Sequence, residues 1–334
     1  MLSAQSNKDM QEEPLLRKMM DKSLSYLIAP LLYLGLISGC SESKIGESEL
    51  KNLYSKPLAR TEKNLKVFHL GHSLVGRTMP LMLQQLAGVN HNFRSQLGWG
   101  TTLKQHWEPE LAINGFEVEN AHENYQDVFE AIKESKYDAF VLTEMVEIKD
   151  AIEGYNSAHY LQKFVEEIAH HNPDARVYLY ESWHSVTDKE GWIYRLDRDF
   201  NKYWLSQIVD PAHIRMENNN TIYLIPVGQV MSAFFKEIER LGGVEGISKP
   251  EDIFNRNSAG ELDNIHINDI GAYLVALVHY SVLYQTNPEG LPYQLYNESG
   301  DKAVAPSKEA AQLMQAITWR VVSENYRTGI IAYR

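Results

Sequence analysis

Short apolar runs alternate with amphipathic stretches from about residue 65 onward. In the amphipathic stretches apolar residues recur at helical spacing, and Leu161, Phe164 and Ile168 lie on one such stripe. The same spacing marks residues 230–241, which end at a Gly-Gly pair, and residues 270–281. The apolar runs are rich in β-branched and aromatic residues and predict strands at 65–70, 92–97, 139–143, 175–180 and 221–227.

Alternating strands and helices of this kind predict the fold class. Strands that are apolar on both faces are typical of a parallel sheet covered by helices on each side. We therefore predict an α/β fold with three layers, α/β/α, around a central parallel sheet of about five strands. Ligands bind beyond the carboxyl ends of the strands in such sheets. The residues that directly follow each strand are therefore the first candidates for a functional site.

The first residues of the chain have a different pattern. Residues 23–39 carry no charge and follow Arg17, Lys18 and Lys22. Their most apolar part, 27–37, is shorter than the about 20 residues that a membrane-spanning helix needs. A basic segment followed by a short apolar segment and small residues is typical of a secretory signal. The small residues end at Cys40, the only cysteine, and residues 37–40 (ISGC) resemble the lipobox of bacterial lipoproteins.

That resemblance implies that Cys40 is acylated, becomes the new N-terminus and anchors the protein to a membrane. We expect a signal peptide at 1–39, a lipidated Cys40 with a flexible polar tether to residue 64, and a single domain at 65–334. Ser41 after the cysteine implies a place in the bacterial cell envelope, on the periplasmic side of the outer membrane. An uncleaved anchor helix with an incidental cysteine is the alternative. Translation from Met19 or Met20 would shorten the long segment before the signal.

Composition excludes several classes of protein. The 334 residues include 44 acidic and 32 basic side chains, for a formal net charge of −12. Because an acidic chain repels phosphate backbones, we expect no nucleic-acid partner. One cysteine excludes a disulfide framework and any multi-cysteine metal site. The 12 histidines show no HExxH or paired spacing, so we expect neither a metal ion nor another cofactor.

Reactive side chains follow the predicted strands. The first strand is followed by Gly-His-Ser-Leu, with the serine at position 73, and the second is followed by Gly-Trp-Gly, ending at Gly100. Asp263 and His266 stand just before the helix that begins near residue 270. A serine and a histidine can act as nucleophile and base, and an aspartate can hold the imidazole in the right tautomer. Glycines let backbone N–H groups approach a ligand closely.

These segments, in this order on strand ends, resemble blocks one, two and five of the SGNH (GDSL-like) hydrolase family. The resemblance covers residues 65–285 and implies the flavodoxin-like SGNH fold and an activity on esters. It also implies that Ser73 attacks the ester carbonyl, that His266 is the base and that Asp263 orients it. The oxyanion hole would then include the N–H groups of Ser73 and Gly100.

The sequence departs from the family pattern at two positions. His72 stands where the family usually has Asp or Asn, and we expect it to shape the turn or to titrate at the mouth of the site. The asparagine of block three is missing, and Thr143 and Glu144 stand at the end of the third strand. An ionised carboxylate cannot donate a hydrogen bond. Either Glu144 is protonated, Thr143 supplies the third donor, or the oxyanion hole has only two donors.

Two further segments are candidates for contacts with a substrate. Trp183 and His184 follow the fourth strand, where they either line the cleft or pack in the core. Residues 242–262 form an irregular insertion before Asp263, and we expect them to cover the cleft.

We therefore expect a serine esterase without a cofactor. A surface-tethered enzyme rich in tyrosine and tryptophan favours a carbohydrate ester, carrying an O-acetyl or other short acyl group, over a lipid. Its partners would be this small-molecule or carbohydrate ester and, through Cys40, a membrane. An acyltransferase with the same triad is one alternative. A binding lipoprotein with impaired catalysis is another, favoured by the missing asparagine.

Overall fold

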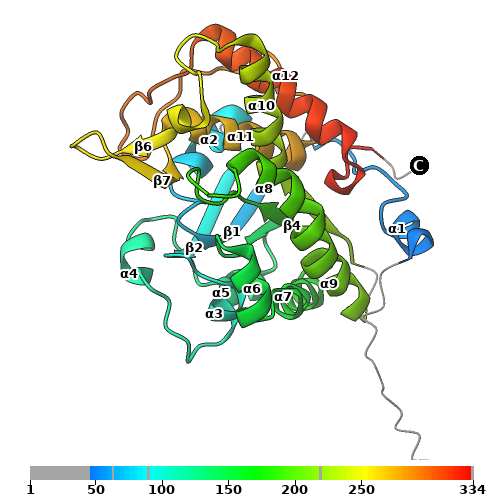
Figure 1. The fold of residues 1–334 in the computed structure, drawn as a ribbon. Helices are drawn as coiled ribbons and strands as arrows, with labels where there is room; N and C mark the ends of the chain where they lie inside the picture. Colours follow the sequence, from blue (N-terminus) through cyan, green and yellow to red (C-terminus); the bar gives the residue numbers. More distant parts are fainter. Residues whose placement is uncertain (1–45, 62–63, 89–90, 218–219, 332–334) are drawn as a thin grey trace, which may run out of the picture. The chain divides into compact units, whose positions relative to one another are not determined.

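The computed structural model describes residues 46–61, 64–88, 91–217 and 220–331, all within one compact unit, Glu42–Arg334 (Figure 1). The predicted signal peptide, Cys40 and the first residues of the predicted tether lie outside the described residues. In the described segments no helix combines the length and apolar character that crossing a membrane requires.

A parallel sheet forms the centre of the unit. Its strand order is β2-β1-β3-β4-β5, and every neighbouring pair is parallel. This is the flavodoxin-like order, in which the chain passes from β1 to β2 on one side and to β3 on the other. The strands are β1 (Lys66–His72), β2 (Asn92–Gly98), β3 (Ala139–Thr143), β4 (Arg176–Glu181) and β5 (Ile222–Pro226).

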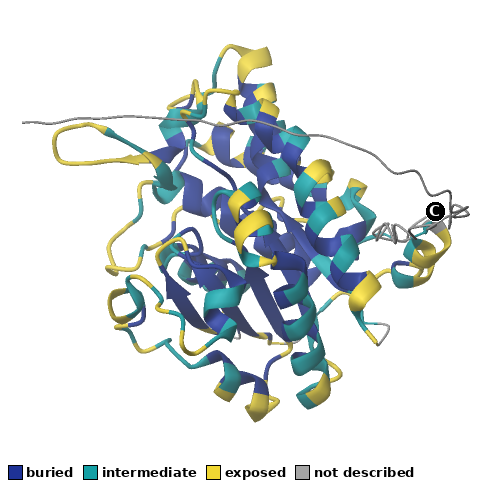
Figure 2. Cartoon of the chain, turned by 60° about the horizontal axis from the view of Figure 1, so that its bottom comes forward, coloured by how far each residue is buried: buried dark blue, intermediate teal, exposed yellow. Residues whose placement is uncertain are grey.

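Helices cover both faces of this sheet because successive strand residues point to opposite faces. In β3, Val141 packs into one core layer and Leu142 into the other. Figure 2 shows the sheet buried between them. The first layer contains α2 (Thr78–Ala87), α8 (Trp192–Asp199), α10 (Val227–Leu241), α11 (Asp269–Tyr284) and α12 (Lys308–Glu324). The second contains α3 (Leu103–Trp107), α5 (Val128–Glu134), α6 (Ile148–Tyr155), α7 (Ser157–His171), a π-helical segment (Phe200–Val209) and α9 (Asp210–Arg215).

The predicted three-layer α/β/α fold, which the resemblance to SGNH hydrolases implies, is confirmed. All five strands were predicted to within two residues at each end, since buried parallel strands are continuous apolar runs. Helix α12 was not predicted. Its buried face is made mostly of small or flexible residues such as Ala310, Ala311 and Met314, which give a weak periodic signal.

The prediction that the tether is flexible up to residue 64 is wrong for its second half. Residues Glu47–Leu53 form α1, and Tyr54 after it is only 1% exposed. The Tyr54 hydroxyl donates to the carbonyl of Ile222 at 2.6 Å, and the Leu58 N–H donates to the carbonyl of Gly329 at 2.7 Å. A single buried aromatic residue and a few hydrogen bonds to backbone carbonyls hold this segment. One apolar residue makes no periodic pattern, so the sequence did not predict an ordered segment here.

The predicted irregular insertion contains regular structure. This structure begins with a 3₁₀ turn (Pro250–Ile253). The strands β6 (Phe254–Arg256) and β7 (Leu262–Ile267) follow and pair as an antiparallel hairpin. This hairpin stands apart from the main sheet (Figure 1). The remaining short elements are α4 (Phe116–Glu119) and a 3₁₀ turn at Tyr326–Thr328.

Candidate active site

The site lies at the switch point of the sheet. Because β1 pairs with β2 on one side and β3 on the other, the loops that follow these strands diverge and leave a crevice. His72 at the end of β1 is in register with Gly98 at the end of β2. Ser73 therefore leaves the sheet beside the Gly-Trp-Gly turn, as the strand ends alone predict.

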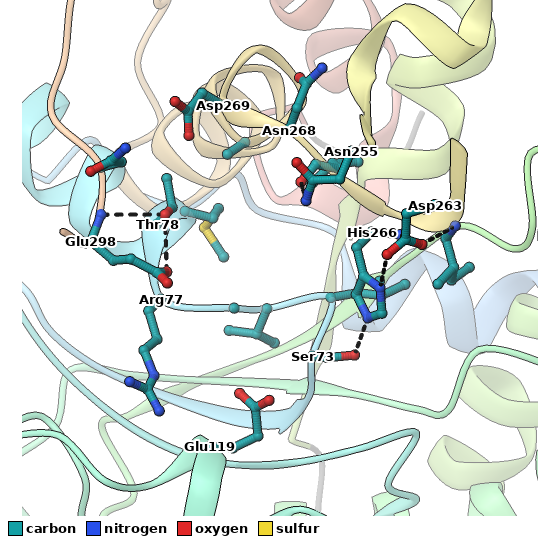
Figure 3. A pocket seen from close by; sticks show the side chains of 18 of the residues that line it. Ser73, Arg77, Thr78, Glu119, Asn255, Asp263, His266, Asn268, Asp269 and Glu298 are labelled. Atoms are coloured by element: carbon teal, nitrogen blue, oxygen red, sulfur yellow. Dashed lines mark hydrogen bonds and ion pairs between the residues drawn. The ribbon is translucent and has the colours of Figure 1, made fainter. Parts of the chain in front are cut away.

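Ser73, His266 and Asp263 form a hydrogen-bonded series (Figure 3). The Ser73 Oγ lies 3.0 Å from the Nε2 of His266, and the Nδ1 of His266 lies 2.8 Å from the Oδ2 of Asp263. A carboxylate can only accept, so the Nδ1 carries the proton and the Nε2 offers its lone pair to the serine hydroxyl. A serine before a helix is often its N-cap, but Ser73 does not cap α2, whose N-cap is Arg77.

The Asp263 carboxylate is itself held by the turn that it opens. Its Oδ1 accepts the backbone N–H groups of Ile265 and His266, both at 3.0 Å. Partial burial acts to raise the pKa of Asp263, but these two N–H groups and the imidazole outweigh it, so the pKa is lowered from its ordinary value. The carboxylate therefore stays charged at neutral pH and fixes the imidazole ring.

Trp183 braces this turn from the core. It is 1% exposed, and its Nε1–H donates to the carbonyl of Ile265 at 2.8 Å. It lies outside the cleft lining, so of the two alternatives the structure favours packing in the core. His184 is also buried away from the cleft. Its carbonyl accepts the Nε1–H of Trp192 at 3.0 Å.

Two backbone N–H groups in the cleft lining are candidates to bind an oxyanion. Ser73 and Gly100 both line the cleft, and in the part of the chain that the structure describes neither N–H has a hydrogen-bond partner. Gly100 has a φ of +56°, which a residue with a side chain rarely adopts. These free donors are the arrangement that a tetrahedral oxyanion needs.

The third donor that the sequence left open does not come from β3. The Thr143 hydroxyl is buried and donates to the carbonyl of Tyr180 at 2.8 Å. The Glu144 side chain is buried as well, and its Oε1 accepts the N–H groups of Met145 at 2.9 Å and Leu103 at 3.3 Å. Neither residue lines the cleft. Of the three alternatives, the structure favours a hole with two donors.

Burial also changes the acidity of Glu144. Desolvation raises the pKa of its carboxyl to about 7, against the opposing effect of the N–H groups that it accepts. The group joins the start of α3 to the loop after β3, so it holds together two of the loops that form the crevice. It does not line the cleft, so a contact between Glu144 and a substrate, also considered from the sequence, finds no support.

His72 is a structural residue. It is fully buried, and its Nε2 donates to the carbonyl of Glu144 at 2.8 Å while its Nδ1 accepts the N–H of Leu74 at 3.3 Å. Burial lowers its pKa to about 4, so the ring is neutral at physiological pH. The expectation that it titrates at the mouth of the site is wrong, whereas the expectation that it shapes the turn agrees with these contacts.

The cleft around Ser73 has a volume of about 960 Å³. The sequence did not predict most of the polar and aromatic side chains that line this cleft, because they come from segments without a recognised motif. Trp99 stands between the two glycines that were noticed, and the Asn255 side chain comes from the insertion. The missed residues are Arg77, Thr78, Trp99, Val118, Glu119, Asn255, Asn297 and Glu298.

No group of three or more His, Cys, Asp or Glu side chains within residues 46–61, 64–88, 91–217 and 220–331 is arranged to hold a metal ion.

No protein-family model matches the chain, and no curated protein matches it significantly. Solved structures are similar to it. They include a family 3 carbohydrate esterase from Clostridium thermocellum, with 12% identity, a TM-score of 0.38, and coverage of 66% of this chain and 94% of that one. A family 3 carbohydrate esterase from Talaromyces cellulolyticus has 12% identity, a TM-score of 0.36, and coverage of 66% and 97%. The salicylyl-acyltransferase SsfX3 of a tetracycline biosynthetic pathway has 13% identity, a TM-score of 0.39, and coverage of 67% and 55%. Similarity of this degree does not identify a substrate.

Proposed function

We propose that this protein is a serine esterase of the SGNH type. The observation that carries the proposal is the hydrogen-bonded series from Ser73 through His266 to Asp263, at 3.0 and 2.8 Å, in a cleft that also holds two free backbone N–H groups. Taken singly, each of these residue types is also common in turns, helix caps and surface loops. At the carboxyl end of β1 the three side chains contact one another, as the nucleophile, the base and the orienting carboxylate of a serine hydrolase must.

In the first half-reaction the Ser73 Oγ forms a bond to the ester carbonyl carbon while its proton passes to the Nε2 of His266. The N–H groups of Ser73 and Gly100 stabilise the oxyanion that develops. Collapse of this intermediate breaks the bond to the alcohol oxygen, which takes the proton from His266. In the second half-reaction water forms a bond to the acyl carbon while its proton passes to His266. The bond from this carbon to the Ser73 Oγ then breaks, the Oγ takes the proton back from His266, and the carboxylic acid leaves.

The proposed substrate is a carbohydrate that carries an O-acetyl or other short acyl group. The cleft supports this because polar side chains such as Arg77, Glu119 and Asn255 stand among its apolar ones. A long acyl chain needs a continuous apolar wall, whereas a sugar offers both hydroxyls and an apolar ring face.

The experiment compares the full chain, purified in mild detergent, with Ser73→Ala on p-nitrophenyl acetate. Turnover that disappears in a folded Ser73→Ala variant supports the esterase. Equal turnover in both proteins would contradict it, because the reaction would then not use the serine.

Two rival functions use the same fold. An acyltransferase would pass the acyl group to a sugar hydroxyl in preference to water, so added xylose would divert acetate into an ester product. The hole with two donors favours a slow or impaired enzyme, because one lost donor typically costs a factor of about 10²–10³ in rate. A binding lipoprotein would show no turnover and no covalent labelling of Ser73.

We propose further that the chain is exported and anchored through Cys40 to the periplasmic side of a bacterial outer membrane. The basic, apolar and small-residue segments before Cys40 support this proposal. Metabolic labelling with a palmitate analogue tests it. Label that is absent from Cys40→Ala supports the anchor, and label that persists in this variant would contradict it.

A further inference from the structure

Trp99 is the most exposed large aromatic side chain in the cleft wall. Its side chain is 53% exposed, although tryptophan is among the residues that gain most from burial. Val118, at 58% exposure, lines the same cleft. Trp99 directly follows Gly98, the register partner of His72, so it leaves the sheet one strand away from Ser73, at a strand spacing of about 4.8 Å.

The Trp99 ring is held in place on its other sides. Its Nε1–H donates to the Oε1 of Glu119 at 2.8 Å, and its backbone N–H donates to the carbonyl of Asn114 at 2.7 Å. A Cβ atom at Gly115 would lie only 2.2 Å from the ring, so the ring rests directly on the Gly115 backbone. Fixing an exposed side chain costs conformational entropy. Packing against the described residues does not offset this cost for the exposed part of the ring.

We infer that Trp99 is the platform on which a pyranose ring of the substrate stacks, and that Glu119 is the positioning residue that holds the platform. This inference rests on the proposed function and names the part of the substrate that the site recognises. An indole face attracts the C–H groups on the apolar face of a pyranose. The polar side chains of the same cleft, Arg77 and Glu298 among them, suit the hydroxyl groups at the ring edge.

A lipid acyl chain fits this wall less well. The indole nitrogen is bound to a carboxylate. Arg77 lines the same cleft, and among the residues that the structure describes its guanidinium donates to the carbonyl of Val118 alone. An acyl chain along this surface would bury these charged groups without satisfying them, which is costly. A sugar ring would pair with them.

The test compares two acetates that differ in whether they carry a ring. Vinyl acetate has none, and xylotriose with O-acetyl groups has three. Replacement by Trp99→Ala is expected to lower the ratio of kcat/KM for acetylated xylotriose to kcat/KM for vinyl acetate by about tenfold, mainly through KM. Trp99→Phe, which keeps a smaller ring, is expected to lie between the parent and Trp99→Ala.

The role of Glu119 has its own matched pair. The amide oxygen of Glu119→Gln still accepts the indole N–H, so this variant is expected to keep the parental ratio. Glu119→Ala frees the ring and is expected to lower the ratio severalfold. Tyr194→Ala removes an aromatic side chain of similar exposure, 58%, outside the cleft, and controls for general effects.

A ratio that Trp99→Ala leaves unchanged would overturn the platform while the esterase stands. Saturation-transfer NMR with unesterified xylotriose keeps the two claims separate, because it needs no turnover. Binding by the parent that is lost in Trp99→Ala supports the platform even if no ester is cleaved. Absence of binding to the parent would overturn it, whereas absence of Ser73-dependent turnover alone would overturn only the proposed function.

Discussion

Asp263 binds His266 twice, once through the side chain and once through the backbone. Its Oδ2 accepts the imidazole Nδ1–H at 2.8 Å, and its Oδ1 accepts the His266 backbone N–H at 3.0 Å. The three-residue spacing makes both bonds within one turn, so one short segment supplies both the imidazole and the carboxylate that orients it. The long-range contact that remains is the one from His266 to Ser73.

Replacement of Asp263 by asparagine is expected to lower kcat by about 10³–10⁴-fold. The amide can still accept the backbone N–H groups, so the turn is kept, but it no longer carries the charge that stabilises the imidazolium. Steady-state kinetics on p-nitrophenyl acetate measures the effect. Asp197→Asn, at an exposed carboxylate that binds Ser232 and Lys236, is the control. Equal kcat in Asp263→Asn and the parent would contradict the assignment.

Trp183→Phe tests the brace behind the triad. It removes the donor to the part-buried Ile265 carbonyl, and we expect a loss of about 1 kcal/mol of unfolding free energy, at the low end of the cost of an unsatisfied carbonyl. We also expect kcat to fall severalfold because the turn that carries His266 loosens. Trp192→Phe is the matched control, since it loses the same kind of bond to the His184 carbonyl. If both variants lose stability but keep kcat, Trp183 is only a core residue.

Arg195 joins three segments near the site and is 2% exposed. It binds Glu147 after β3, Asp188 after β4 and Asp199 at the end of α8. Arg195→Met would leave the buried carboxylate of Asp199 with a weaker set of partners, and removing one member of a buried ion pair costs about 3–5 kcal/mol. Urea unfolding checks this loss. Arg240→Met breaks an exposed pair with Glu237 and is expected to leave the midpoint unchanged.

Buried histidines predict a loss of stability in acid. Burial lowers the pKa of His279 and of His91 to about 4, and that of His69 well below its ordinary value. In the unfolded chain these rings take up a proton near pH 6.5, whereas in the folded chain they stay neutral. The free energy of unfolding therefore falls as the pH falls below about 6.5, by about 1.4 kcal/mol per pH unit for each ring.

His69→Leu removes one of these rings and should make the decline between pH 6.5 and pH 5 shallower. Urea unfolding at both pH values measures it. A decline as steep as that of the parent would show that His69 is protonated in the folded state as well.

The strands and the order of the triad were predictable because they depend on local pattern. A buried parallel strand is a continuous apolar run, and the residues that follow it must reach the edge of the sheet where ligands bind. Ser73 and Gly100 were found in this way, whereas Asp263 and His266 were found from their spacing just before a helix. The structure brings all four to one cleft.

The direction of a side chain beyond a strand end was not predictable from the same pattern. Thr143 and Glu144 turn inward, where Tyr180 and the start of α3 supply partners from distant parts of the chain. Trp99 is paired with Glu119, twenty positions away and outside any motif. Such contacts depend on tertiary packing, and a single sequence carries no periodic signal for them.

The most direct test of the account is covalent labelling of the full chain with a fluorophosphonate, followed by mass spectrometry of the labelled peptide. A fluorophosphonate reacts only with a serine that an adjacent base activates, so it reads the geometry of Ser73 and His266 without assuming a substrate. One adduct is expected, on Ser73, and it should disappear in Ser73→Ala and be strongly reduced in His266→Ala. A folded parent without an adduct, or an adduct that survives in Ser73→Ala, would contradict it.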